Sequence, residues 1–208
     1  MDIHELKSDI IKRYKARSTK NRPFIIAIDG LGGAGKSTIA NELAEELQSI
    51  CAIELIHIDY LIVERSKRYD TGFDEWYEYY YLQWDIEFIK KNILLPLHNN
   101  NLQLVLPFYN QSADMVSNRK IILDSNSILI IEGVFLLRHE WRNFYDYRLF
   151  IDIPRQVREE RVLQRDVYIG DSEARLSKYE RRYWPAEDYY LEKEKPLAVA
   201  DIICDFLK

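Results

Sequence analysis

The amino-acid sequence predicts an α/β fold in which a mostly parallel sheet is covered by helices on both faces. Short apolar segments rich in β-branched residues alternate with segments of helical periodicity along the 208 residues, and this alternation is typical of such sheets. No linker, internal repeat or low-complexity stretch interrupts the pattern. We therefore expect one domain over residues 1–208.

The first half of the chain predicts a strand–loop–helix–strand unit after a leading helix. The leading helix is indicated by apolar residues at helical spacing: Ile3, Leu6, Ile10 and Tyr14. An apolar strand over 24–28 precedes a glycine-rich loop, a helix over 37–50 and a second strand over 53–58 that ends at Asp59. The crossover places these two strands in parallel.

The second half predicts helices, a hairpin and three further strands. Pro154 begins one of the helices, since proline suits the first helical turn. The other expected elements are a helix over 74–92, an antiparallel hairpin from 102–108 and 120–123, strands over 127–131, 148–153 and 202–204, and a helical segment over 172–192.

The segment from Gly30 to Ser37 has the spacing G-x-x-x-x-G-K-[ST] between a predicted strand and a predicted helix. Glycines allow a tight turn in which several backbone N–H groups point at one anion, and the helix dipole adds positive potential. The motif predicts that Lys36 reaches the β- and γ-phosphates of a nucleoside triphosphate and that the Ser37 hydroxyl binds Mg²⁺. The other residues of the predicted cradle are Gly30, Gly32, Gly33, Ala34 and Gly35.

Two acidic residues, Asp59 and Glu132, each end a buried apolar run. Ligands of open α/β sheets lie beyond the carboxyl ends of the strands. A carboxylate there can hold Mg²⁺, directly or through water, or accept a proton from an attacking hydroxyl. Either residue could instead cap a turn. Asp29 also ends a strand, but it precedes the glycine-rich loop and is expected to fix that turn.

A row of arginines follows Pro154 at intervals of three and four residues, which places them on one side of a helix. They are Arg155, Arg158, Arg161 and Arg165. For Arg155 and Arg158 we favour an ordinary solvated face. The apolar residues on the opposite side, expected to face the core, are Val157, Leu163 and Val167.

Arg161 and Arg165 lie beside a polar segment, about residues 165–192, that we predict to be a mobile lid. The planar donor fork of arginine can follow charge spread over transferring phosphoryl oxygens. We therefore expect both side chains to take part in catalysis when the lid closes.

Composition narrows the class of partner. The chain has 34 acidic and 29 basic residues, which argues against a general nucleic-acid or anionic-membrane surface. The longest apolar run, 128–137, is too short to span a bilayer, and the first residues lack a secretion signal. Cys51 and Cys204 make neither a disulfide framework nor a metal spacing. We expect a cytoplasmic protein and leave a homo-oligomer open.

With these motifs the chain resembles the uridine kinase family of P-loop kinases over most of its length from Phe24 onward. The resemblance implies a three-layer P-loop NTPase fold with five core strands, an appended substrate hairpin and an arginine-bearing lid. It implies transfer of the γ-phosphoryl group of ATP, with Mg²⁺, to the 5′-hydroxyl of a nucleoside.

The resemblance also implies roles for particular residues. Asp59 would be the base that accepts the hydroxyl proton, and Glu132, in Ile131-Glu132-Gly133, would help hold Mg²⁺. Arg161 and Arg165 match lid arginines, although one extra residue stands inside that motif. The positions that match the triphosphate-binding residues are Gly35, Lys36, Ser37 and Thr38.

On the acceptor side, Phe73-Asp74 resembles the family's Phe-Asp pair, in which the ring contacts the base and the carboxylate binds ribose hydroxyls. Pro107-Phe108-Tyr109 resembles a strand that supplies another base contact, here through Tyr109. The chain departs from the family after that tyrosine, because Asp114 stands where a histidine is expected. A pyrimidine would therefore be recognised differently here.

A basic patch, Arg65-Ser66-Lys67-Arg68-Tyr69, lies between Asp59 and Phe73. It is either a solvated loop or a site where Arg65 and Arg68 recognise an acceptor carrying a phosphate or carboxylate, which arginine binds in bidentate fashion. The second interpretation would make the protein a kinase of a phosphorylated or carboxylated acceptor, similar to phosphoribulokinase or pantothenate kinase.

Two rivals from other classes share the phosphate loop. A GTP-operated switch usually carries an Asn-Lys-x-Asp element, and no such tetrapeptide occurs in the sequence. A regulatory NTPase would need no acceptor pocket, whereas the Phe73-Asp74 pair and the predicted hairpin favour one. A small-molecule acceptor is therefore the predicted partner.

Overall fold

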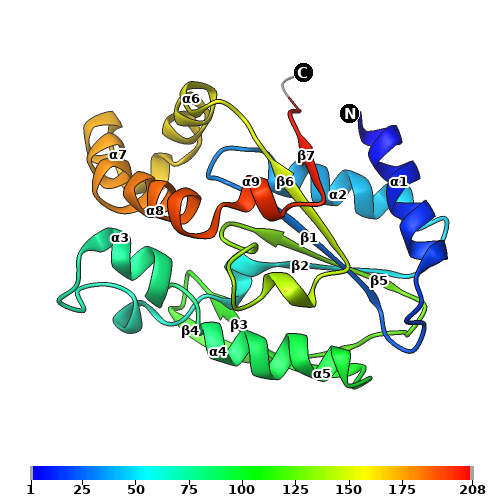
Figure 1. The fold of residues 1–208 in the computed structure, drawn as a ribbon. Coiled ribbons are helices and arrows are strands. Elements are labelled where there is room, and N and C mark those ends of the chain that lie inside the picture. Colours follow the sequence, from blue (N-terminus) through cyan, green and yellow to red (C-terminus); the bar gives the residue numbers. More distant parts are fainter. Residues whose placement is uncertain (1, 207–208) are drawn as a thin grey trace.

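The computed structural model describes residues 2–206 and contains a five-stranded sheet whose strands are all parallel (Figure 1). In spatial order the strands are β2 (Ile53–His57), β5 (Ile128–Gly133), β1 (Phe24–Gly30), β6 (Tyr147–Ile151) and β7 (Ile202–Cys204). The predicted fold class and the predicted core strands are confirmed.

The central strands are buried on both faces because their sequences are continuously apolar. Along β1, Ile25 and Ala27 point into one hydrophobic core and Ile26 and Ile28 into the other, as the two-residue period of a strand requires. Polar residues are confined to the strand ends. There Glu132 of β5 lies beside Ile28 on one side and His57 of β2 on the other.

Helices cover both faces of the sheet, as predicted. Figure 1 shows α1 (Ile3–Ala16) and α2 (Lys36–Leu47) together on one side and α4 (Ile86–Ile89) and α5 (Leu95–His98) on the other. Leu6, Ile10 and Leu43 help fill the core into which Ile26 and Ile28 point, which we call the first core. Ile89, Leu97 and Tyr190 help fill the core into which Ile25 and Ala27 point, which we call the second core. The prediction of a leading amphipathic helix is therefore also confirmed.

The predicted continuous helix over 74–92 is wrong in detail. The chain forms α3 (Glu75–Tyr77) and a π-helical turn, Glu78–Leu82, and then breaks. Trp84 donates from its indole nitrogen to the Ile58 oxygen over 2.9 Å, and the Asp85 side chain caps α4 by accepting from the Phe88 nitrogen over 2.8 Å. This anchor and cap end one helix and begin another. A second π-helical turn, Lys90–Leu94, joins α4 to α5.

A separate hairpin of β3 (Gln103–Asn110) and β4 (Met115–Ile122) confirms the predicted antiparallel pair and extends it. Leu104 and Leu106 are buried in the second core. The turn is held by the Asn110 side chain, which accepts from the backbone nitrogens of Ser112 and Ala113. The tip of the hairpin thereby brings Tyr109 and Asp114 toward the loop that follows β2.

The segment predicted to be a lid, about residues 165–192, contains α7 (Ser172–Lys178), a π-helical turn, Tyr179–Tyr183, and most of α8 (Trp184–Glu194), and α6 (Arg155–Arg165) precedes it. That this segment acts as a mobile lid stays a prediction. The short remaining helices are α9 (Pro196–Val199) and the 3₁₀ turns Ile58–Leu61, Arg65–Lys67, Arg142–Phe144 and Val167–Ile169.

The predicted orientation of α6 needs correction. Arg158, expected in solvent, is only 6% exposed, and Val167, expected in the core, is 64% exposed. Val157 is half-buried and packs against the core that contains Ile26 and Ile28, as predicted, whereas Leu163 packs against a separate cluster around Val162. The reason is that α6 packs its Arg158 and Val162 side onto the glycine-rich loop rather than onto the sheet. Arg155 is exposed, as predicted.

No helix within residues 2–206 is both long and apolar enough to cross a membrane. The cytoplasmic location, the oligomeric state and the expected lack of nucleic-acid binding stay predictions.

Candidate active site

The glycine-rich loop joins β1 to α2 and forms a tight backbone cradle. Gly33 has a φ of 79°, and a Cβ there would lie 2.6 Å from the backbone oxygen of Arg158, so only glycine fits. Lys36, the first residue of α2, donates from Nζ to the Leu31 oxygen over 3.0 Å. Burial lowers the pKa of Lys36, against the opposing effect of the acidic groups around it. The ammonium therefore lies inside the loop, at the positive end of the helix.

Asp29 supports this loop from beneath, as predicted. Its buried carboxylate accepts from the Gly30 nitrogen over 2.7 Å, from the Leu137 nitrogen over 2.9 Å and from the Tyr190 hydroxyl. Burial raises the pKa of Asp29 to about 6, although these three hydrogen bonds oppose the shift. Asp29 is thus a structural residue that ties the cradle to α8.

Glu132 stands at the carboxyl end of β5, next to the cradle. Its Oε1 lies 3.1 Å from the Ser37 hydroxyl and 2.5 Å from Nδ1 of His57. The hydrogen bond to Glu132 raises the pKa of His57, and burial opposes it. Sequence reasoning missed His57, although a lone histidine two positions before Asp59 on an apolar strand was an available signal. The pairing of β2 with β5 brings His57 and Glu132 together.

Asp59 follows β2 and opens onto the same cavity as Lys36 and Glu132. Burial by the surrounding walls and the negative charge of Glu132 raise the pKa of Asp59, while Lys36 and Arg165 oppose the shift. A carboxylate with a raised pKa accepts a proton more readily than an ordinary aspartate.

The oxygen donors of Ser37, Asp59 and Glu132 suit a magnesium ion. All three line one cavity, and hydroxyl and carboxylate oxygens are the ligands that Mg²⁺ prefers. The donor chemistry is therefore compatible with the predicted magnesium site, which stays a prediction.

The cradle and the acidic residues form one end of a cavity of about 760 Å³. The predicted site residues that line it are Gly32, Gly33, Lys36, Ser37, Asp59, Arg65, Arg68, Tyr109, Glu132 and Arg165. Residues of the hairpin and of the loop after β2 line the same cavity. Gly30, Ala34, Gly35 and Thr38 belong to the loop and its helix but are not part of this lining.

Phe73 and Asp74 lie outside the lining of this cavity, and their predicted contact with an acceptor stays a prediction. Phe73 is 58% exposed and stacks on Tyr77 with ring centroids 4.6 Å apart. The chain turns at Gly72, where φ is 89°, and then enters α3. Because Tyr77 lies one helical turn beyond Phe73, the two rings pack together along that helix.

The two predicted lid arginines occupy different places. Arg165 lines the cavity and donates from Nε to Asp166 over 2.6 Å. Arg161 instead donates from Nη1 to the Gly33 oxygen over 3.2 Å and is not part of the lining. Arg161 thus contacts the loop that would hold a phosphate, and its predicted part in catalysis stays a prediction.

Glu187 of α8 is a site residue that the sequence did not reveal. Its Oε1 accepts from the backbone nitrogen of Gly32 over 2.7 Å, and its Oε2 accepts from Arg158 over 2.9 Å. Arg158 also donates to the Gly32 oxygen over 3.1 Å. A buried ion pair thus holds both backbone polar groups of Gly32, one from each of the two peptide units that meet at this residue. In the sequence, Glu187 is one of many charges in a charged segment, and no pattern distinguishes it.

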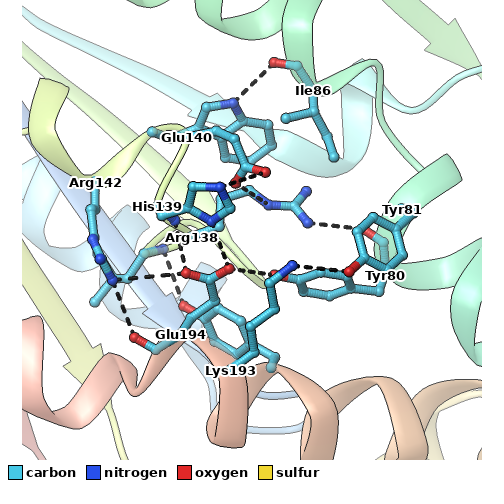
Figure 2. A network of polar contacts seen from close by, with 12 residues as sticks. Tyr80, Tyr81, Ile86, Arg138, His139, Glu140, Arg142, Lys193 and Glu194 are labelled. Carbon is cyan, nitrogen blue, oxygen red and sulfur yellow. Dashed lines mark hydrogen bonds and ion pairs between the residues drawn. The ribbon is translucent and has the colours of Figure 1, made fainter.

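A second polar network fixes the far end of α8 (Figure 2). The Glu194 carboxylate accepts from the Tyr80 hydroxyl over 3.0 Å and from the His139 backbone nitrogen over 2.9 Å. Arg142 lies 3.8 Å from the same carboxylate, and Arg138 lies 3.5 Å from Glu140. The contacts of Glu194 anchor the end of α8, and the two guanidinium groups offset part of the acidic charge of Glu140 and Glu194.

The parallel sheet, the glycine-rich loop and the acidic strand ends define a protein of the P-loop kinase fold. The model of the Phosphoribulokinase / Uridine kinase family matches residues 25–205. The chain belongs to this family.

Individual relatives agree with that assignment. The chain is 29% identical to a uridine kinase of Staphylococcus epidermidis over 191 residues, 88% of this chain and 87% of that protein. It is 28% identical to the uridine kinase of Limosilactobacillus reuteri over 150 residues, 70% of this chain and 66% of that protein. A solved structure described as a possible uridine kinase from Bacillus stearothermophilus is 38% identical, with 99% and 100% of the two chains covered and a TM-score of 0.80.

Proposed function

We propose that the protein is an ATP-dependent kinase that transfers the γ-phosphoryl group to a hydroxyl of a small metabolite. The observation that carries this proposal is the shared cavity of about 760 Å³, in which Lys36 of the cradle and Asp59 both line the wall. A γ-phosphate held by the cradle and an acceptor hydroxyl beside Asp59 could approach each other there in the geometry of an in-line transfer. The family assignment supports the same reaction class.

Each residue has a defined task in this proposal. The loop amides and Lys36 hold the phosphates, and the acidic and hydroxyl oxygens of Glu132 and Ser37 would hold Mg²⁺. The ion, when bound, supplies positive charge that neutralises the phosphate oxygens. Asp59 orients the acceptor hydroxyl and accepts its proton. Arg165 adds positive charge where negative charge develops in the transition state.

A nucleoside is the first acceptor to test, because the relatives named above are uridine kinases. ATP is the proposed donor, since the sequence lacks the Asn-Lys-x-Asp element of guanine-specific proteins. A regulatory NTPase without an acceptor is disfavoured, because the cavity extends well beyond the cradle to the hairpin residue Tyr109.

Two measurements test the proposal. Calorimetry should detect magnesium-dependent binding of ATP that is tighter than binding of GTP, and Lys36→Met should weaken it strongly. ADP production should then depend on an added alcohol from a panel of nucleosides, sugars and their phosphorylated forms. Failure to bind any purine triphosphate, or ATP hydrolysis that no alcohol stimulates, would contradict the proposed kinase.

A further inference from the structure

Three cationic side chains gather around one tyrosine in the same cavity that the cradle lines. Arg65 and Arg68 come from the loop after β2, and Lys178 comes from the end of α7; all three line the cavity. Their charged groups surround one ring, that of Tyr69, at 4.8, 4.9 and 5.3 Å from its centroid. Residues more than 100 positions apart thus build a single positive wall.

These three charges are not neutralised by neighbouring acids. In the chain between residues 2 and 206, none of the three forms an ion pair, whereas the adjacent Lys67 pairs with Glu64. A fourth cation at Tyr69, Arg182, is fully buried and paired with Glu78 over 3.0 Å, so its role is structural.

Asp114 is an acid that lies against this wall. Its Oδ1 accepts from the Arg65 backbone nitrogen over 3.0 Å and from the Tyr109 hydroxyl over 2.9 Å. Its single charge offsets at most one of the three cations. The wall therefore keeps a net positive charge toward the cavity.

The wall is also held in place. Arg68 is only 6% exposed, and it donates to the Val63 oxygen over 2.8 Å and to the Tyr109 hydroxyl over 3.1 Å.

The positive charge of the wall also affects the pKa of the neighbouring Tyr69. Burial alone would raise the pKa of its phenol, but the charges of Arg182, Lys178 and Arg68 outweigh burial and lower it.

We propose that Arg65, Arg68 and Lys178 bind an oxyanion group of the acceptor, so that the substrate is a small alcohol bearing a phosphate or a carboxylate. The inference rests on the proposed kinase function and specifies its acceptor. Uncompensated charge in a partly desolvated wall is costly, and an oxyanion relieves that cost through charge-assisted hydrogen bonds. A neutral nucleoside would leave the net charge uncompensated.

Matched acceptor pairs test the substrate class. Initial rates of ADP formation are compared for ribose and ribose 5-phosphate, glycerol and glycerol 3-phosphate, glycerol and glycerate, and uridine and uridine 5′-monophosphate. We expect kcat/KM to be at least tenfold higher for the anionic member of the productive pair. Comparison of the phosphorylated acceptors with glycerate, which carries a carboxylate, identifies which oxyanion is preferred. Faster turnover of neutral uridine than of every anionic compound would overturn the inference.

Variants test the residues. Arg65→Gln and Lys178→Gln each remove one charge from accessible side chains, and we expect each to raise KM for the anionic acceptor about tenfold with little change in KM for ATP. Arg119→Gln on β4 is the matched control, because Arg119 is exposed and lies outside the cavity lining. Equal kinetics of all three variants and the unaltered protein would overturn the assignment.

A binding measurement works without turnover. The cradle is first saturated with magnesium and a non-hydrolysable ATP analogue, which prevents a phosphate from binding there, and glycerol 3-phosphate and glycerate are then titrated. We expect binding of at least one, weakened about tenfold in Arg65→Gln and Lys178→Gln. If the ATP analogue binds but neither acceptor binds, or if the variants bind the acceptor as well as the unaltered protein does, this inference alone is overturned. If the ATP analogue does not bind, the proposed kinase function itself is overturned.

Discussion

The Glu187 carboxylate accepts a hydrogen bond from the backbone nitrogen of Gly32 over 2.7 Å, joining α8 to the glycine-rich cradle. The same carboxylate pairs with Arg158, and both partners are almost fully buried. The geometry of the cradle therefore depends on two helices that follow it by more than 100 residues in the sequence.

Glu187→Gln should destabilise the protein, because it leaves the Arg158 charge buried without a counter-ion. We expect the free energy of unfolding to fall by about 3 kcal/mol, measured by urea denaturation. Asp188→Asn is the matched control: its partner Arg155 is exposed, and losing that pair should change the free energy of unfolding by less than about 0.5 kcal/mol. Equal effects of the two substitutions would contradict the structural role of the buried pair.

Asp59→Asn should slow phosphoryl transfer and leave nucleotide binding nearly intact. The amide cannot accept the hydroxyl proton as the carboxylate does, so we expect kcat to fall by about 100-fold or more. The dissociation constant for ATP, measured by calorimetry, should change by less than about threefold, because the cradle and Lys36 are unaltered. A fully active Asp59→Asn enzyme would exclude Asp59 as the base.

The two lid arginines should give different kinetic defects. Arg165→Ala should lower kcat at saturating substrates by about 100-fold, because Arg165 lines the cavity where charge develops. Arg161→Ala should chiefly raise KM for ATP, since Arg161 holds the Gly33 oxygen of the cradle. Steady-state kinetics with ATP varied separates the two effects. An unchanged kcat in Arg165→Ala would remove this arginine from the catalytic residues.

The stability of the cradle should depend on pH through Asp29. Its pKa is raised from an ordinary 3.8 to about 6 in the folded protein, so the folded state binds the proton more tightly than the unfolded state. The contribution of Asp29 is therefore full below the lower value and is lost as pH rises through the higher one. The free energy of unfolding relative to Asp29→Asn should fall by up to about 3 kcal/mol over this interval. Parallel pH profiles of the two proteins would contradict the shift.

The order of elements was predictable because it depends on local patterns. The period of apolar residues marks the core strands, and the spacing from Gly30 to Ser37 marks the cradle. Asp59 and Glu132 were found because parallel strands in open sheets present their carboxyl ends to ligands. These features require no knowledge of distant contacts.

Errors arose where packing partners determine a residue's environment. Arg158 has the sequence context of a solvated helix face, yet α6 packs that face onto the cradle, where Glu187 compensates the charge. Phe73 and Asp74 matched a motif, but they lie outside the cavity lining, where Phe73 stacks on Tyr77, and their contact with an acceptor stays a prediction. Neither outcome can be read from spacing along the chain.

The sequence by itself determined the α/β class, the position of the cradle and the two acidic strand ends, because each follows from residue type and local periodicity. Only the tertiary structure decided that Lys178 joins Arg65 and Arg68 around Tyr69, and that His57 lies against Glu132. The physical reason is that electrostatic environments depend on distances in space. Such distances are fixed only when α7, the hairpin and the strands pack together.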